Sequence, residues 1–299
     1  MVVGVAIISF SAISVRLSEA SPVTVGFFRT AYALPVLFIA RTLTSRDLTR
    51  TSRQRRLAFG AGFALAADFA SWHLAIELIG AGLATVVGSV HVVVTMIAGW
   101  FLLSQRPTRL ALASIPVVLI GVVLISGFGS AGERGEDPVL GVIFGMLTAI
   151  LYTTFLLLLR QSSMSGGTPI EPLLEATAGA TVGALLLAPI DPGFSLVPTW
   201  PSHGWLLTLA LGAQVAGWLI ITYVLPQLEA WETSLLLVLQ PAGTILWAYL
   251  IFAEVFSASQ WLGLVLVVFG VTTVTISRAL NPGPGSLESI GPPTRPDSS

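Results

Sequence analysis

The chain has 299 residues, of which 54% are hydrophobic and 10% are charged, and its formal net charge at pH 7 is −1. Soluble domains carry about 25% charged residues, so this composition excludes an ordinary soluble domain and predicts an all-α integral membrane protein. The absence of cysteine excludes disulfides and thiolate metal sites, and the near-neutral charge argues against nucleic acid as a partner.

Ten apolar segments follow one another, and a membrane-spanning helix needs about 20 such residues. We expect transmembrane helices at residues 2–17, 22–41, 57–79, 82–104, 109–127, 138–159, 170–190, 204–225, 231–253 and 258–277. Pro22, Pro107, Pro138 and Pro169 stand at segment starts, where proline suits the first helical turn. The tail of residues 279–299 is polar and rich in proline, so we expect it to be disordered.

The arginines predict the orientation. With ten spans both termini lie on one side, and that side receives most of the arginines: Arg41, Arg46, Arg50, Arg53, Arg55, Arg56, Arg106, Arg109, Arg160, Arg278 and Arg295. The other side has Arg16 and Arg134. Cytoplasmic loops collect basic residues, so both termini should be cytoplasmic. Nucleic-acid binding by the arginine-rich loop of residues 41–56 is the alternative, and it needs an extra assumption. The use of arginine without lysine is typical of a GC-rich genome, and we expect a bacterial inner (plasma) membrane.

The chain also carries an internal repeat. The stretch VVGSVHVVVTMIAGWFLLSQ, at residues 86–105, is matched 149 residues later by LLLVLQPAGTILWAYLIFAE, at residues 235–254. Each half then holds five spans, an odd number, so equivalent helices should point in opposite directions, as in the inverted repeats of many secondary transporters. We expect a first repeat at residues 1–127, an external linker at 128–137, a second repeat at 138–278 and a cytoplasmic tail at 279–299.

Four stretches carry a family resemblance: PVTVGFFRTAYALPVLF after the first span, GSVHVVVTMIAGWFLLSQ, LLLVLQPAGTILWAYLIFAE and WLGLVLVVFGVTTV. They resemble the EamA-type branch of the drug/metabolite transporter superfamily, over residues 1–278 as two repeats. The resemblance implies ten helices and export of amino acids, other metabolites or drugs. Two positions depart from the family pattern. The proline of the fourth helix is replaced around Val92 and survives as Pro241, and the acidic residue ending that helix is Gln105 and survives as Glu254.

Polar residues inside a span are costly and are candidates for function. Asp68 lies near the centre of the third span, and Gln214 occupies the equivalent position 146 residues later. Trp72 and Trp218 follow them by four residues and therefore share their helix faces. A structural ion pair between Asp68 and Arg29 of the second span is the alternative to a role in substrate or proton handling.

Two further mid-span positions are polar. His91 is matched by Gln240 in the repeat. Pro241 follows Gln240 and leaves a backbone carbonyl one turn earlier without its helical hydrogen bond, so that carbonyl needs a polar neighbour or water. Packing alone is the other interpretation of His91. With Arg29, the polar groups and tryptophans predict a substrate and proton pathway that lines one central cavity, formed by Arg29, Asp68, Trp72, His91, Gln214, Trp218, Gln240 and Pro241.

These features favour a secondary transporter, an exporter of a small metabolite that works by alternating access, with proton coupling left open. No GxxxxGK[ST] motif and no cofactor-binding motif occurs. A membrane-embedded enzyme using His73 and Glu77 is the alternative, although three histidines without HExxH make a poor metal set. A non-transporting sensor or assembly factor is a third interpretation. The expected partners are a small-molecule substrate and the lipid bilayer. GxxxG pairs at Gly141/Gly145 and Gly179/Gly183 leave a homodimer open.

Overall fold

The structure is a computed structural model that describes residues 1–44, 50–126, 137–164, 167–197 and 199–280. Arg46, Arg134, most of the expected external linker and residues 281–299 of the tail lie outside the described residues. The first half contains α1 Val2–Ser9, α2 Ser11–Ser18, α3 Pro22–Ala31, α4 Ala33–Leu43, α5 Ser52–Gly88, α6 His91–Leu103 and α7 Arg109–Ile125. The second half contains α8 Pro138–Ser163, α9 Ile170–Leu187, η1 Ala188–Ile190, α10 Ser202–Thr208, the π-helix η2 Leu209–Gly217, α11 Trp218–Val224, η3 Leu225–Gln227, α12 Ala230–Leu237, α13 Leu239–Phe252 and α14 Ala258–Leu280.

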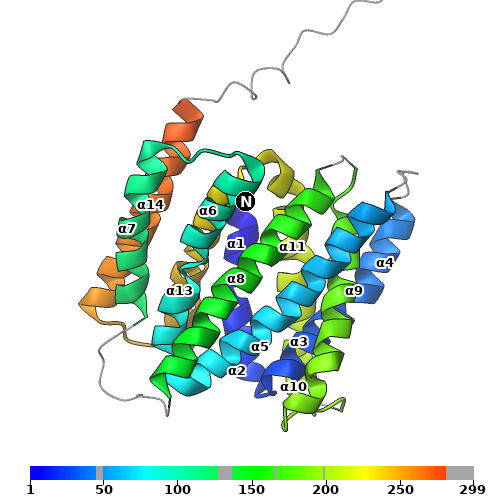
Figure 1. Cartoon of the computed structure of the whole chain (residues 1–299). Helices are drawn as coiled ribbons and strands as arrows, with labels where there is room; N and C mark the ends of the chain where they lie inside the picture. The colour runs from blue at the N-terminus through cyan, green and yellow to red at the C-terminus, as the bar shows by residue number, and fades with distance from the viewer. Residues whose placement is uncertain (45–49, 127–136, 165–166, 198, 281–299) are drawn as a thin grey trace, which may run out of the picture.

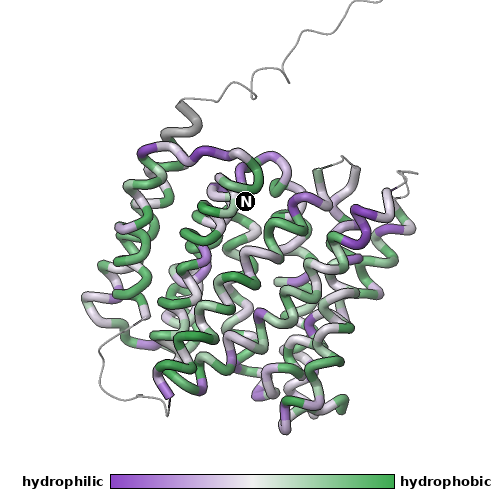
Figure 2. The backbone as a smooth tube through the Cα atoms, viewed as in Figure 1, coloured by the Kyte–Doolittle hydropathy of each residue, from purple (hydrophilic) through white to green (hydrophobic). Residues whose placement is uncertain are grey.

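Throughout the described residues every regular element is helical, which confirms the predicted fold class. Eight helical stretches are long and apolar enough to cross a membrane, and the shorter apolar stretches Val2–Ser18 and Arg109–Ile125 complete the ten expected segments. Apolar residues run along the length of the helices, and hydrophilic ones gather mainly toward the two ends of the molecule (Figure 2). The helices are therefore suited to a bilayer, with their polar ends at its two surfaces.

A single glycine separates the third and fourth spans inside α5. Gly80 has φ 79° and ψ 155°, a conformation that only glycine adopts without strain. The turn falls between the predicted segments 57–79 and 82–104. The third span begins earlier than predicted, at Ser52, because Thr51 and Gln54 form a capping box that extends the helix beyond its apolar part.

The two halves meet through matching contacts, which are plainest where α7 packs along α14 at one side of the molecule (Figure 1). A β-carbon on Gly121 would lie 2.8 Å from Val267 Cγ2, and one on Gly270 would lie 2.6 Å from Val118 Cγ2. Gly121 and Gly270 are equivalent in the repeat, as are Val118 and Val267. Each contact is therefore the image of the other.

Equivalent contacts between the two repeats also occur elsewhere in the molecule. The first span packs on the π-helix η2 and on α13, and correspondingly α8 packs on α5 and on α6. The two large hydrophobic cores divide by helix position and not by repeat. One joins spans 1, 2 and 3 to spans 6, 7 and 8, with Leu237 added from α12, and the second joins spans 4 and 5 to spans 9 and 10. A small third core, formed by Ala75, Ile79 and Ala84, lies within α5 where spans 3 and 4 meet. The repeats are interleaved, so a central site must be built from both.

The GxxxG glycines are used inside the molecule. A β-carbon on Gly179 would lie 2.1 Å from the Phe59 carbonyl oxygen, and one on Gly183 would lie 2.7 Å from Ala66 Cβ. Gly141 and Gly145 likewise pack against Ile79 and Val87 of α5. Close contact between helices is what these motifs provide. Here that contact joins α5 to α8 and α9 within one chain, so these glycine faces do not support the homodimer that the sequence left open.

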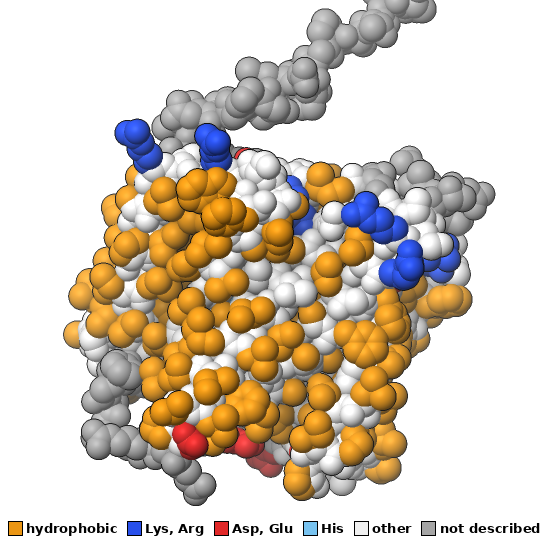
Figure 3. All heavy atoms as spheres, in the orientation of Figure 1, with side chains coloured by type: hydrophobic (Ala, Val, Ile, Leu, Met, Phe, Trp, Pro, Cys, Tyr) orange, Lys and Arg blue, Asp and Glu red, His pale blue; other side chains and the backbone are white. Residues whose placement is uncertain are grey.

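Charge is distributed as the positive-inside rule requires of a membrane protein. On the face shown in Figure 3, arginine side chains gather along the upper edge and acidic side chains mainly along the lower edge, with a hydrophobic band between them. The upper edge is where α4 ends and α5 begins (Figure 1). The described part of the arginine-rich loop therefore lies at one end of the molecule.

A β-carbon at Gly179 can be tested against one at Gly212. We expect Gly179→Ala to destabilise the protein by about 1–3 kcal/mol, because α9 must move away from the α5 backbone. Gly212 has no atom within 4 Å of its β-carbon position, so Gly212→Ala should be neutral or stabilising by up to about 1 kcal/mol. Thermal unfolding of the purified variants in detergent measures both, and equal unfolding midpoints would contradict the close α5–α9 packing.

Candidate functional site

A buried hydrogen-bond chain crosses the interface between the two halves. The Nε–H of Arg29, on α3, donates to Gln214 Oε1 at 2.9 Å, and Gln214 Nε2 donates to Thr177 Oγ1 at 3.1 Å. Arg29, Gln214 and Thr177 are 9%, 1% and 0% exposed. A network of this kind, with its members satisfied, fixes one arrangement of its side chains. Arg29 comes from the first repeat, and Gln214 and Thr177 come from the second.

Asp68 lies beside this chain and is 5% exposed. Its Oδ1 atom is buried without a hydrogen-bond partner among the described residues. Arg29 interacts electrostatically with Asp68, but the two are not among the ion pairs of the described residues. Buried polar atoms are nearly always hydrogen-bonded, so an unpaired carboxylate oxygen calls for a partner from outside the fold.

Tyr152 of α8, which was not predicted as a site residue, links this group to His91. It lies near Arg29, and its ring meets the His91 ring edge-on with centroids 4.9 Å apart. Tyr152 also contacts Phe155, which packs edge-on against Trp218 at 4.8 Å. A tyrosine in the run LTAILYTTFLLLL resembles an ordinary apolar residue, and its hydroxyl was the only available signal.

His91 is the first residue of α6, and its ring is oriented by a contact with the backbone. Its Nδ1 atom is 3.1 Å from the Gly88 carbonyl oxygen, while its Nε2 atom is buried without a partner among the described residues. The Thr153 hydroxyl donates to the His91 carbonyl at 3.4 Å and lies 2.8 Å from the Thr95 hydroxyl. His91 therefore joins the polar centre through Tyr152 and Thr153, and not through Asp68 directly.

The structure does not bring all the predicted residues into one contact network. Asp68, Arg29, Gln214, Trp218 and His91 are joined directly or through Tyr152 and Phe155. The Trp72 ring instead meets the His73 ring at 5.2 Å. The side chain of Gln240 forms no hydrogen bond with another described residue. The backbone carbonyl of Gln240 accepts a hydrogen bond from the Thr244 hydroxyl at 3.1 Å, and the same hydroxyl donates to the backbone carbonyl of Ser9 at 3.0 Å.

Both halves break the helix at the same place. Ser89 has φ −66° and ψ −12°, and Val238, its equivalent 149 residues later, has φ −67° and ψ −12°. The matching spans also end alike, with left-handed Ser104 and Ala253. Only the second break has a proline, Pro241. A break of the same kind therefore forms at Ser89 without a proline.

The π-helix that carries Gln214 was not predicted. Residues Leu209–Gly217 widen the eighth span, while Asp68 stands in the regular helix α5 of the other half. Stretches of π-helix are rare and frequently occur at functional sites. Gly217 packs within this stretch against Ile8 of α1, where a β-carbon would lie 2.5 Å from Ile8 Cγ2. The pattern of apolar residues in the sequence does not distinguish a π-helical turn from an α-helical one.

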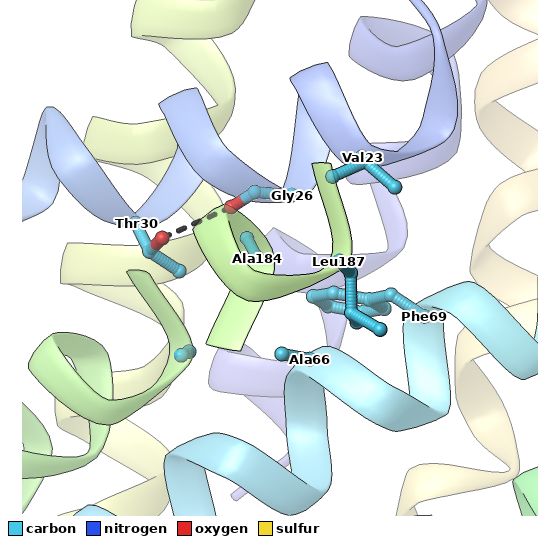
Figure 4. Close-up of a pocket in the computed structure, with 8 residues that line it drawn as sticks. Val23, Gly26, Thr30, Ala66, Phe69, Ala184 and Leu187 are labelled. Carbon is cyan, nitrogen blue, oxygen red and sulfur yellow. Dashed lines mark hydrogen bonds between the residues drawn. The ribbon is translucent and has the colours of Figure 1, made fainter. Parts of the chain in front are cut away.

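Asp68 does not line either of two pockets in the described part of the chain. One, of about 10 Å³, lies between α3, α5 and α9 and is lined by apolar side chains together with Thr30, whose hydroxyl donates to the Gly26 carbonyl at 3.0 Å (Figure 4). At most one water fits such a space. The other, of about 370 Å³, lies at the turn after α2 and is lined by residues 17–21 and 24 and by residues between 193 and 202. It is large enough for a small molecule.

Ion pairs lie at both ends of the bundle. Glu175 pairs with Arg50 at 3.0 Å and with Arg55 at 3.8 Å. Arg160 donates from Nε to the Leu228 carbonyl at 3.0 Å. At the opposite end Arg16 forms an ion pair with Glu254.

Gln105, which replaces the acidic residue of the family pattern, and Glu254, which retains it, have separate structural roles. Gln105 Oε1 accepts from the Ala230 N–H at 2.8 Å and so caps α12, whereas Glu254 pairs with Arg16. Among the described residues, no group of three or more histidine, cysteine, aspartate or glutamate side chains could hold a metal ion. His73 Nδ1 lies 2.7 Å from the Phe69 carbonyl oxygen and so is engaged by its own helix.

These observations define a class: a multi-pass helical membrane protein of two interleaved repeats with a buried polar centre between them. The model of the EamA-like transporter family matches residues 1–127 and 139–276, so the chain belongs to this family of drug/metabolite-type membrane transporters. A solved crystal structure superposes with a TM-score of 0.78 at 15% identity, covering 93% of this chain and 96% of its own, which shows the shared fold. No curated protein sequence matches the chain.

The proline-free break predicts that α6 accepts a proline at Val92. The Val92 N–H reaches the Ser89 carbonyl at 3.2 Å, within the first turn, where proline is tolerated. We expect Val92→Pro to fold with a loss below about 1 kcal/mol. Met96→Pro, one turn further into the same helix, should cost about 3 kcal/mol or more. Thermal unfolding compares the two, and equal losses would contradict the equivalence of the two breaks.

Proposed function

We propose that the protein is a secondary transporter that exports a small polar or amphipathic metabolite by alternating access. The observation that carries the proposal is the buried Asp68 carboxylate oxygen, which has no hydrogen-bond partner in the described part of the chain and lies near Arg29 and Gln214 at the interface of the two repeats. Ionisable groups held inside a membrane bundle mark substrate and ion pathways. In inverted-repeat transporters the binding site lies at this interface, near the middle of the membrane.

The closures at the two ends support alternating access. The Arg50–Glu175 pair ties the start of α5 to α9 at one end, and the Arg16–Glu254 pair ties α2 to the end of α13 at the other. Each pair joins segments from opposite repeats. Breaking one pair while the other holds would open the centre to one side at a time, which is the movement of two repeats about a fixed site.

A proton gradient is the energy source for transport that fits this site best. A buried carboxylate can hold either a proton or a cationic substrate, and the exchange of one for the other couples their movements. We propose the same location as the sequence indicates: a bacterial inner membrane, with the arginine-rich end in the cytoplasm and the pocket beside α2 opening outward.

Counterflow in proteoliposomes tests the transport function. Purified protein is reconstituted into vesicles that are loaded with an unlabelled compound, and uptake of the radiolabelled compound is followed for amino acids and other metabolites. Accumulation above that of protein-free vesicles for at least one compound supports transport. No accumulation with any compound, from protein that elutes as a single species, would contradict it.

Asp68→Asn tests the site within that assay. The change keeps shape and hydrogen-bonding capacity but removes the charge, so we expect a protein that folds and inserts and transports at least about 100-fold more slowly, as expected for a group that cannot be replaced. The control is Asp68→Leu with Arg29→Leu, which removes both charges together. An ion pair that is only structural can often be replaced by apolar residues without loss. Transport by this double variant at the wild-type rate would make Asp68 a structural residue.

The orientation has its own test. An epitope tag after Ser299 should be accessible to antibody only after the cell membrane is permeabilised, because the arginine-rich end and both termini face the cytoplasm. The positive control is a tag placed between residues 128 and 136, which should be reached from outside. Labelling of the Ser299 tag in intact cells would reverse the orientation.

A further inference from the structure

Arg29 and an ionised Asp68 would carry opposite charges in a buried environment, and yet they form no ion pair among the described residues. The attraction between two charges grows as they approach and is strong where water is absent. A flexible arginine would therefore be expected to close on the carboxylate. The hydrogen bond from Arg29 Nε to Gln214 opposes this movement, together with the Phe69 ring, whose centroid lies 5.1 Å from the guanidinium carbon.

We propose that Gln214 is a positioning residue that holds Arg29 away from Asp68, so that a carboxylate oxygen of Asp68 stays free to bind a cationic nitrogen of the substrate. The last part rests on the transport function proposed above, because it names the charge that the transported compound carries at this site. The first part concerns only the resting arrangement of three side chains.

Gln214 is fixed well enough to act in this way. Arginine can only donate hydrogen bonds, so the amide oxygen of Gln214 must face Arg29 and its NH₂ group must face Thr177. Gln214 and Thr177 are 1% and 0% exposed. Thr177 stands on α9, whose backbone meets α5 at Gly179. The helix that carries Asp68 thus packs against the helix that anchors Gln214.

The surroundings favour a cation. An ionised carboxylate only accepts hydrogen bonds, which suits an ammonium group. Tyr152 lies close to Arg29 and Asp68, and Phe155 and Trp218 continue from it as an aromatic series. Aromatic faces attract ammonium ions. An anionic compound could use Arg29, but it would have to approach the unpaired Asp68 oxygen, and like charges in a buried site repel.

Labelling with a hydrophobic carbodiimide tests the arrangement without a known substrate. This reagent modifies buried carboxyl groups that no cation holds, and mass spectrometry of the intact, detergent-solubilised protein locates the label. We expect Asp68 to be labelled in the wild-type protein. In Gln214→Met, which keeps the length of the side chain but cannot hold Arg29, Arg29 should close on Asp68 and labelling should fall about tenfold.

Two variants separate positioning from packing. The double variant Gln214→Met with Arg29→Leu removes the cation that would pair with Asp68. Labelling of Asp68 should then return to the wild-type level. A defect caused by poor packing would persist. If Gln214→Met does not elute as a single species, Thr177→Val replaces it, since this change removes the anchor of Gln214 and should lower labelling in the same direction. Wild-type labelling in the folded single variants would overturn the role of Gln214.

Protection from labelling tests the ligand. Benzyltrimethylammonium and tetramethylammonium should protect Asp68, whereas neopentylbenzene, which has carbon in place of the charged nitrogen of benzyltrimethylammonium, should not. Equal protection by charged and neutral probes, or no protection by either ammonium ion, would overturn the proposed cation site. Failure of transport is separate: with no counterflow of any compound but the expected labelling and protection, the site stands and the transport function fails.

Discussion

Arg29 carries its charge into an apolar interior where a lone guanidinium would be very unfavourable, and the centre of the protein is built to compensate it. Gln214 accepts its Nε–H, the Phe69 ring lies 5.1 Å below it, and Asp68 supplies the opposite charge at longer range. These groups come from three different spans. The charge of one side chain therefore requires both repeats to meet at this point.

The interleaving of the repeats follows from the same requirement. A site made from one half alone would lie at the edge of the molecule, exposed to lipid. Each of the two large hydrophobic cores contains equivalent helices from both halves, so the polar centre is built from paired helices. The repeats differ at this centre: equivalent positions hold Asp68 and Gln214, and only the second is on a π-helix. The paired scaffold thus places one acidic and one neutral side chain near Arg29.

The sequence was sufficient for the fold and only partly for the site. The length of the apolar segments and the internal repeat can be recognised in the sequence, and the helices follow them. The sequence also identified Asp68 and Gln214 as candidates, because a polar residue within a membrane span is easily recognised. Tyr152 was missed because a tyrosine in an apolar run carries no local signal, and the π-helix was missed because hydrophobicity does not reveal an extra residue per turn. The pairing of Glu175 with Arg50 was not predicted, because the two residues are far apart in the chain and meet only when α5 packs along α9. The break at Ser89 has no proline to mark it.

The most direct measurement of the account asks whether the centre is reached from both sides of the membrane. The chain has no cysteine, so a single cysteine at Trp72, one helical turn from Asp68 on the same face, can be probed alone. A membrane-impermeant maleimide is applied to right-side-out and to inside-out vesicles. Alternating access about a central site predicts labelling in both preparations, reduced in each by a transported compound. Labelling from neither side, or from one side only under all conditions, would contradict it.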